Sequence, residues 1–210
     1  AVGPVCQSSG MPVLDMPLAE LQKYQGRNPR PTDFDAYWSE ALAEMNAVDP
    51  QVQLEPVATP ATFAECFHLW FTGVGGARIH AKLVRPKNPT PGAAVVEFHG
   101  YSWRSGEWHE GYRWAAQGIS WFAMDVRGQG GLSEDVGGVR GPTLHGHIVR
   151  GLDDDPKKLM YRSVYLDCAQ LAGIAMAQPF VDPKRVGTNG GSQGGALSLA
   201  CSALEPRIAR

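Results

Sequence analysis

The pattern of apolar positions predicts an α/β protein. Apolar residues recur every three or four positions, the spacing of a helix, in four segments: 32–49, 108–117, 161–176 and 194–204. Short apolar runs typical of strands occupy five others: 67–72, 78–84, 93–98, 121–125 and 185–189. The runs 93–98 and 121–125 are apolar on both faces and flank a helical segment, which indicates a βαβ unit. We therefore expect a mostly parallel sheet flanked by helices, with a hairpin formed by residues 67–84.

Three segments lie outside this pattern. Residues 1–14 precede it and are interpreted as a foreign leader or cloning scar, expected to be disordered. Residues 17–31 are expected to form an irregular arm, and the glycine-rich stretch 127–155 a long loop, which in compact domains is usually functional or mobile. The predicted organisation is a leader (1–14), an arm and helix (15–60) and a core (61–210).

Composition excludes some classes of function. The formal charge is −2, with acidic and basic residues mixed, so nothing directs the protein to nucleic acid or to an anionic membrane. We find no apolar run of 18 residues, so a transmembrane helix is not expected. The four cysteines show no CxxC spacing and indicate free, mostly buried thiols in a reducing compartment. They are Cys6, Cys66, Cys168 and Cys201.

The sharpest motif is Gly-Gly-Ser-Gln-Gly at residues 190–194, between a predicted strand and a helix of small residues. A nucleophile elbow needs this context, because its serine lies on a strained turn with the hydroxyl exposed. Glycines on either side let strand and helix approach closely. We interpret Ser192 as the nucleophile. The alternative, a phosphate-binding turn, lacks both the Lys-Ser/Thr pair and GxGxxG spacing.

A second motif, Phe-His-Gly-Tyr at residues 98–101, follows the predicted strand 93–98. In proteins with a nucleophile elbow, a loop at this point and the residue after the serine donate the amides of an oxyanion hole. We assign these amides to Tyr101 and Gln193. His99 is a tempting base, but it precedes the oxyanion loop, so we favour a structural hydrogen bond for it.

A third motif, Arg127-Gly128-Gln129, follows the predicted strand 121–125. Its glycine permits a tight turn, and Arg127 is suited to a bidentate pair with a carboxylate. We interpret these three residues as a structural anchor for the floor of the site.

The remaining polar and aromatic clusters favour structural roles. His145 and His147 lack the further ligands of a metal site, so we expect no metal and no organic cofactor. The acidic run 153–155 is interpreted as solvated or as the lead-in to a helix. Three tryptophans are expected to pack around the oxyanion loop, with one of them available to line a substrate pocket. They are Trp103, Trp108 and Trp114.

Together these residues resemble the acetyl xylan esterase and cephalosporin-C deacetylase family of carbohydrate esterases. The similarity covers residues 15–38, the Arg-Gly-Gln motif at 127–129, the Tyr-Arg-Ser-Val-Tyr segment at 161–165 and the Gly-Ser-Gln-Gly motif at 191–194. The resemblance implies an α/β-hydrolase fold and removal of acetyl groups from sugars or small alcohols by Ser192. It also implies a cytoplasmic homo-oligomer, often a hexamer, without metal or cofactor.

The chain departs from the family pattern after the serine. No histidine follows Ser192, although in α/β-hydrolases the acid and the histidine come after the nucleophile. We therefore expect the C-terminal strands to be absent from this chain, leaving the strand before Ser192 as an apolar edge. The chain is then a fragment, or it pairs with a second chain that supplies those strands.

Two alternatives remain open. A prolyl-oligopeptidase-type peptidase, or another hydrolase of this fold, shares the Gly-Gly-Ser-x-Gly-Gly sequence, although the motif at 127–129 and the arm argue against it. A truncated hydrolase-like module without its own catalytic base is a non-enzymatic alternative, because loss of the triad nearly abolishes turnover.

Overall fold

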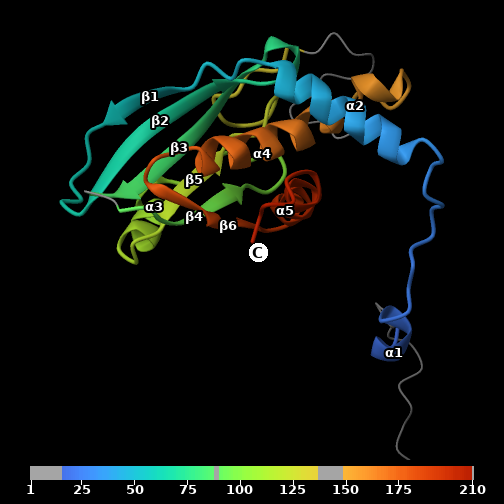
Figure 1. The fold of residues 1–210 in the computed structure, drawn as a ribbon, viewed down its shortest axis with the longest axis horizontal. Helices are drawn as coiled ribbons and strands as arrows, with labels where there is room; N and C mark the ends of the chain where they lie inside the picture. Colours follow the sequence, from blue (N-terminus) through green and yellow to red (C-terminus); the bar gives the residue numbers. More distant parts are fainter. Residues whose placement is uncertain (1–15, 88–89, 137–148, 210) are drawn as a thin grey trace, which may run out of the picture. The chain divides into compact units, whose positions relative to one another are not determined.

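Six strands form one sheet in the part of the chain that the structure describes (Figure 1). This structure is a computed structural model and describes residues 16–87, 90–136 and 149–209. Across the sheet the strands follow the order β1-β2-β3-β5-β4-β6. They are β1 (Gln53–Val57), β2 (Ala64–Thr72), β3 (Arg78–Pro86), β4 (Gly92–Phe98), β5 (Ser120–Met124) and β6 (Val181–Gly190).

Helices and short turns connect these strands. The α-helices are α1 (Leu18–Leu21), α2 (Phe34–Ala47), α3 (Trp108–Ala115), α4 (Met160–Met176) and α5 (Gln193–Leu204). Two 3₁₀ turns are η1 (Val74–Gly76) and η2 (Pro156–Lys158). The chain divides into two units after Tyr37, and the sheet belongs to the second. The leader assigned to residues 1–14 lies outside the described residues, and the three-part division at 14 and 60 stays a prediction.

The sheet is mixed, which corrects the expectation of a mostly parallel one. The pairings β1–β2, β2–β3 and β3–β5 are antiparallel, whereas β4 runs parallel to both β5 and β6. The predicted hairpin is confirmed, with Thr72 opposite Arg78. The predicted βαβ unit is confirmed as β4-α3-β5. The three parallel strands, β4, β5 and β6, are connected in sequence through the helices α3 and α4. A short hairpin could not connect them, because it joins only antiparallel strands.

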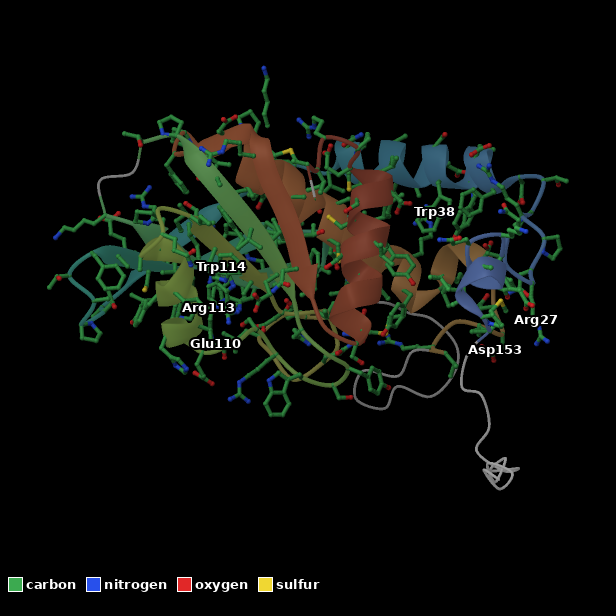
Figure 2. All side chains as sticks on the ribbon, turned by 90° about the horizontal axis from the view of Figure 1, so that it is seen from below. Arg27, Trp38, Glu110, Arg113, Trp114 and Asp153 are labelled. Atoms are coloured by element: carbon green, nitrogen blue, oxygen red, sulfur yellow. The ribbon has the colours of Figure 1, made fainter. Side chains whose placement is uncertain are left out.

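Helices cover both faces of the sheet and enclose separate apolar layers. The helices α4 and α5 pack against β4 and β6, and α3 packs against β3 and β5. Val96 and Phe98 belong to the large core under α4 and α5, whereas Val95 belongs to the smaller core with Trp121. Side chains alternate between the faces of a strand, so β4 supplies both cores. Figure 2 shows α3 beside the sheet, where Arg113 lies 3.7 Å from Glu97 of β4.

The N-terminal segments agree in part with the predicted pattern. The helix predicted before Pro50 is α2, whose Ala41 is buried with Val74 and Leu166. The arm predicted to be irregular includes the single helical turn α1, which begins after Pro17. Proline favours such a start because its missing N–H has no helical acceptor to lose.

The strand β1 was missed by the sequence pattern. Its side chains are almost all exposed, and Pro56 interrupts it, so it shows neither apolar alternation nor a clean strand signal. Such a strand is tolerated at the edge of a sheet, where one side needs no hydrogen-bond partner. Residues 53–57 therefore join the sheet, although the pattern placed them with the arm.

The strand before the serine is longer than predicted and starts at Val181 rather than residue 185. Its pairing with β4 shifts register between Gly92 and Ala94, whose partners are Val181 and Val186, and Pro183 lies within this irregular stretch. Among the described residues it pairs only with β4 and forms an edge of the sheet. We expected this edge to be apolar, and that expectation is wrong. Only Val181 and Val186 of β6 are buried, and most of its other side chains are polar.

Candidate active site

The turn between β6 and α5 holds Ser192 in a strained conformation. Ser192 has φ of 56° and ψ of −123°, a region that residues other than glycine rarely adopt. Its side chain is exposed and makes no capping hydrogen bond to α5, which begins at Gln193. The hydroxyl is therefore presented at the N-terminus of a twelve-residue helix, where positive potential favours a developing negative charge.

Two glycines make this turn possible. A Cβ on Gly190 would overlap the backbone of Gly194, and a Cβ on Gly194 would overlap the carbonyl of Phe98. Backbone atoms cannot move aside as the end of a flexible side chain can. Strand β6, strand β4 and helix α5 thus approach each other here at a distance that only glycine allows.

The loop after β4 lies beside this turn, because Phe98 and Gly190 are paired at the ends of two parallel strands. Tyr101 is in a turn and is 45% exposed. No backbone hydrogen bond occupies the N–H of Tyr101 or of Gln193 among the described residues. The two amides assigned to an oxyanion hole are thus on adjacent segments, and the assignment itself stays a prediction.

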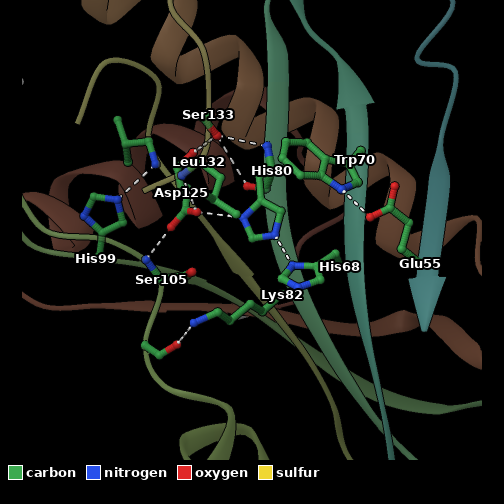
Figure 3. Close-up of polar contacts among 12 residues, drawn as sticks. Glu55, His68, Trp70, His80, Lys82, His99, Ser105, Asp125, Leu132 and Ser133 are labelled. Carbon is green, nitrogen blue, oxygen red and sulfur yellow. Dashed lines mark hydrogen bonds and ion pairs between the residues drawn. The ribbon is translucent and has the colours of Figure 1, made fainter. Parts of the chain in front are cut away.

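His99 is held as a neutral structural residue. Its Nε2 accepts the Val126 N–H at 2.9 Å (Figure 3). The proton is therefore on Nδ1, which donates to the Gly100 carbonyl at 2.7 Å. Burial lowers the pKa of His99. Because both ring nitrogens are occupied, His99 is not placed to act as the base for Ser192, which agrees with the role predicted for it.

The residue Gln129 connects three segments of the site. Its Oε1 accepts the backbone N–H of Ser102 at 2.8 Å, and its Nε2 donates to Gln193 Oε1 at 2.9 Å. The side chain of Gln193 also accepts a hydrogen bond from the Tyr161 hydroxyl at 2.5 Å. Sequence reasoning assigned Gln129 to a structural anchor but missed Tyr161. The Tyr-Arg-Ser-Val-Tyr similarity at residues 161–165 was the available signal.

The predicted ion pair of Arg127 is present, and its partner is Asp167. Nε and Nη2 of Arg127 each lie 2.6 Å from a carboxylate oxygen of Asp167, and the guanidinium also reaches the Val74 carbonyl at 3.2 Å. Both side chains are almost fully buried. Burial raises the pKa of Asp167, and the bidentate contact with Arg127 opposes that rise. Gly128 follows with φ of +71°, which turns the chain toward Gln129.

A second polar cluster lies inside the fold beside the site and centres on Asp125 (Figure 3). Its carboxylate lies 2.6 Å from Nδ1 of His80 and accepts the backbone N–H groups of Ser105 at 2.6 Å and Leu132 at 2.9 Å. Burial alone would raise the pKa of Asp125, but these three hydrogen bonds outweigh it and hold the pKa well below its usual range.

Two further side chains complete this cluster. Ser133 Oγ accepts the backbone N–H of His80 at 2.9 Å and donates to the Asp125 carbonyl at 2.6 Å. His68 Nδ1 lies 2.7 Å from His80 Nε2, and burial together with His80 lowers the pKa of His68. We call these six residues the histidine–aspartate cluster: His68, His80, Ser105, Asp125, Leu132 and Ser133. It ties β3 to the loops on both sides of the site.

The structure separates the three tryptophans, which corrects the expectation that all pack around the oxyanion loop. Trp108 and Trp114 pack against the smaller core from α3. Trp103 is 62% exposed and lines a hollow of about 240 Å³ with Gly190 and Gly191. The first two lie on a helix and must cover the sheet, whereas Trp103 lies in the loop between β4 and α3 and has no such constraint.

No group of three His, Cys, Asp or Glu side chains that could hold a metal ion occurs within residues 16–87, 90–136 and 149–209. His145 and His147 lie outside these residues. Asp155, from the predicted helix lead-in, accepts the Lys157 N–H at 2.9 Å at the start of η2. In the same described ranges, no helix is long and apolar enough to cross a membrane.

The family model for acetyl xylan esterase (AXE1) matches residues 11–210 of this chain. The chain belongs to the acetyl xylan esterase family. The resemblance stated from the sequence is thus confirmed.

Solved esterases support the same fold. Acetyl xylan esterase 1 from Thermoanaerobacterium sp. JW/SL YS485 is 57% identical, with a TM-score of 0.88, and the match covers 92% of this chain. The acetyl xylan esterase from Paenibacillus sp. R4 is 34% identical, with a TM-score of 0.85, and the match covers 92% of this chain and 62% of that one. The α/β-hydrolase fold class is therefore confirmed.

The chain is shorter than these relatives. The match covers 61% of the Thermoanaerobacterium esterase. Acetyl esterase Axe7A from Xylanibacter ruminicola is 29% identical over 202 residues, which are 90% of this chain and 44% of that protein.

Proposed function

We propose that the full-length protein carrying this chain is a serine esterase. It removes acetyl groups from acetylated xylo-oligosaccharides or from similar small acetyl esters, such as cephalosporin C. The observation that supports this most is Ser192, an exposed serine with φ of 56° between β6 and α5, in a chain of the acetyl xylan esterase family. That geometry is what a nucleophile elbow requires.

The proposed reaction begins when Ser192 Oγ attacks the acetyl carbonyl carbon as its proton passes to a base. The carbonyl oxygen becomes an oxyanion, which the N–H groups of Tyr101 and Gln193 stabilise. The C–O bond to the sugar then breaks, and the alcohol leaves with the proton returned from the base. Water hydrolyses the acetyl-enzyme by the same steps and releases acetate.

The base and the acid of the triad are proposed to come from outside these residues. No histidine follows Ser192 in the sequence. The imidazole of His99 is occupied at both nitrogens, and His80 is fully buried between Asp125 and His68. A C-terminal segment, or a second chain, supplies the histidine and carboxylate in this proposal. Assembly as a homo-oligomer, a hexamer by family resemblance, and a cytoplasmic location also remain part of it.

A second candidate function is a hydrolase-like module without catalysis of its own. The intact mass of the natural product separates the two: a native chain of 22.7 kDa that acts without a companion chain and releases no acetate supports the module. A longer chain, or a companion chain, supports the esterase.

A serine-directed phosphonate tests the nucleophile in the full-length protein. We expect one covalent adduct, on Ser192, and loss of acetate release from p-nitrophenyl acetate and from acetylated xylo-oligosaccharide. Ser198→Ala is a matched control, because this serine lies on α5 and donates to the Gly194 carbonyl, so its loss should leave labelling unchanged. An adduct elsewhere, or faster turnover of a peptide substrate than of acetyl esters, would contradict the proposal.

A further inference from the structure

The side chains of Gln129 and Gln193 form a reciprocal amide pair. Gln129 Nε2 donates to Gln193 Oε1 at 2.9 Å, and Gln193 Nε2 donates to Gln129 Oε1 at 3.1 Å. Each amide is donor and acceptor to the other, so neither can rotate without breaking two hydrogen bonds. This pair links the turn after β5 to the first residue of α5.

The hydroxyl of Tyr161 adds a further hydrogen bond to this pair. It donates to Gln193 Oε1 at 2.5 Å from the first turn of α4. Burial raises the pKa of Tyr161 to about 12, so the hydroxyl keeps its proton through neutral and mildly alkaline pH. Gln193 Nε2 also donates to the His99 carbonyl at 3.4 Å, and a carbonyl can only accept, so Gln193 Oε1 is the end of the amide left to accept from Tyr161.

The other end of the pair holds the loop after β4. Gln129 Oε1 accepts the N–H of Ser102 at 2.8 Å, directly after Tyr101, and the Gly130 N–H donates to the Trp103 carbonyl at 2.9 Å. Ser102 has φ of 58°, so its backbone conformation is strained and needs support from its surroundings. The turn after β5 thus supplies such support to the residue that follows the Tyr101 amide.

We propose that Tyr161 and Gln129 are positioning residues, which set the spacing between the amides of Tyr101 and Gln193 through the side chain of Gln193. Neither residue contacts the reacting atoms in this proposal, which rests on the proposed esterase function. An oxyanion hole is effective only when its donors are held within about 0.5 Å of the productive geometry. Loss of one donor costs about 100-fold or more in rate, so a displaced donor costs less than that.

The test compares Tyr161→Phe with Tyr165→Phe in the full-length protein. Tyr165 lies one turn further along the same helix, with its ring centroid 5.7 Å from that of Tyr161, and burial raises the pKa of its hydroxyl too. We expect Tyr161→Phe to lower kcat for p-nitrophenyl acetate roughly tenfold with KM nearly unchanged, because the oxyanion forms only in the transition state. Tyr165→Phe should leave both constants unchanged.

A double-mutant cycle with Gln129→Leu shows whether both residues act through Gln193. If they do, the double variant loses less kcat than the product of the two single losses. Equal kcat in the Tyr161 and Tyr165 variants, or a loss that appears only in KM, overturns the inference. If Tyr161→Phe does not fold, the kcat and KM of Gln129→Leu decide it by the same criterion. Full activity of Ser192→Ala would instead reject the proposed nucleophile, a separate failure.

Discussion

The turn around Ser192 and the histidine–aspartate cluster lie at the same end of the sheet and are built in different ways. The turn is contiguous, from Gly190 to Gly194, and its serine is exposed. The cluster is gathered from β3, the end of β5 and two loops, and its central carboxylate is 2% exposed. The first depends on backbone geometry that one short motif encodes. The second depends on buried hydrogen bonds among residues up to 53 positions apart.

This difference predicts how each region responds to change. An exposed hydroxyl without a capping hydrogen bond contributes little to folding, so its loss should affect activity alone. A buried carboxylate with three donors leaves those donors unpaired when it is removed, so its loss should affect stability first. The four predictions that follow test that separation, beginning with the largest effect.

Ser192→Ala should abolish the esterase activity of the full-length protein while leaving its stability intact. We expect kcat to fall about ten-thousand-fold or more, as when other serine hydrolases lose their nucleophile. The thermal midpoint should remain within experimental error, because the side chain makes no capping hydrogen bond. Acetate release and calorimetry measure the two effects. A large fall in the thermal midpoint would contradict this prediction, because it would show that the Ser192 side chain stabilises the fold.

Asp125→Asn should destabilise the fold by about 3 kcal/mol. An amide group accepts through one oxygen only. The variant therefore loses the acceptor either of the Ser105 N–H, which bonds to Oδ1, or of both His80 and the Leu132 N–H, which share Oδ2. Urea unfolding measures the change. Asp153→Asn is the matched control, because Asp153 is exposed (Figure 2), and it should change stability by less than about 0.5 kcal/mol. Equal losses of stability in the two variants would show that the buried hydrogen bonds of Asp125 do not stabilise the fold.

Gly194→Ala should destabilise the protein by about 2 kcal/mol, whereas Gly195→Ala should be neutral or stabilising. A Cβ at Gly194 would overlap the Phe98 carbonyl, but at Gly195 the nearest atom, the Gly190 carbonyl oxygen, is 3.4 Å away. Alanine within a helix gains up to about 1 kcal/mol over glycine. Unfolding midpoints of the two variants provide the measurement. Similar losses in both would show that α5 is not held against β4 by close backbone contact.

The stability difference between the natural protein and Asp125→Asn should depend on pH. Because the folded pKa of Asp125 is below its unfolded value of about 3.9, its contribution is full above pH 4 and is lost as the pH falls through the folded pKa. The difference should be constant from pH 7 to 5 and then shrink, by at most about 1.4 kcal/mol per pH unit. Urea titrations at several pH values test this. A constant difference down to pH 3 would contradict this, because it would show that folding does not change the pKa of Asp125.

The local elements and the turn that holds Ser192 could be predicted from the sequence. The hairpin of β2 and β3, the β4-α3-β5 unit and the turn at residues 190–194 were all predicted from spacing and from glycine. Such features depend on interactions among near neighbours: the alternation of a strand, the period of a helix, and the steric freedom that two glycines provide.

The contacts between side chains that are distant in the sequence could not be predicted in this way. Nothing in the spacing of His80, Asp125 and Ser133 showed that β3 and β5 would become antiparallel neighbours, and Tyr161 was not expected to contact Gln193. The tertiary structure also decided that the sheet is mixed and that exposed β1 completes it. The physical reason is that hydrogen bonds and burial depend on distances in space, which a linear pattern of apolar and polar residues does not specify.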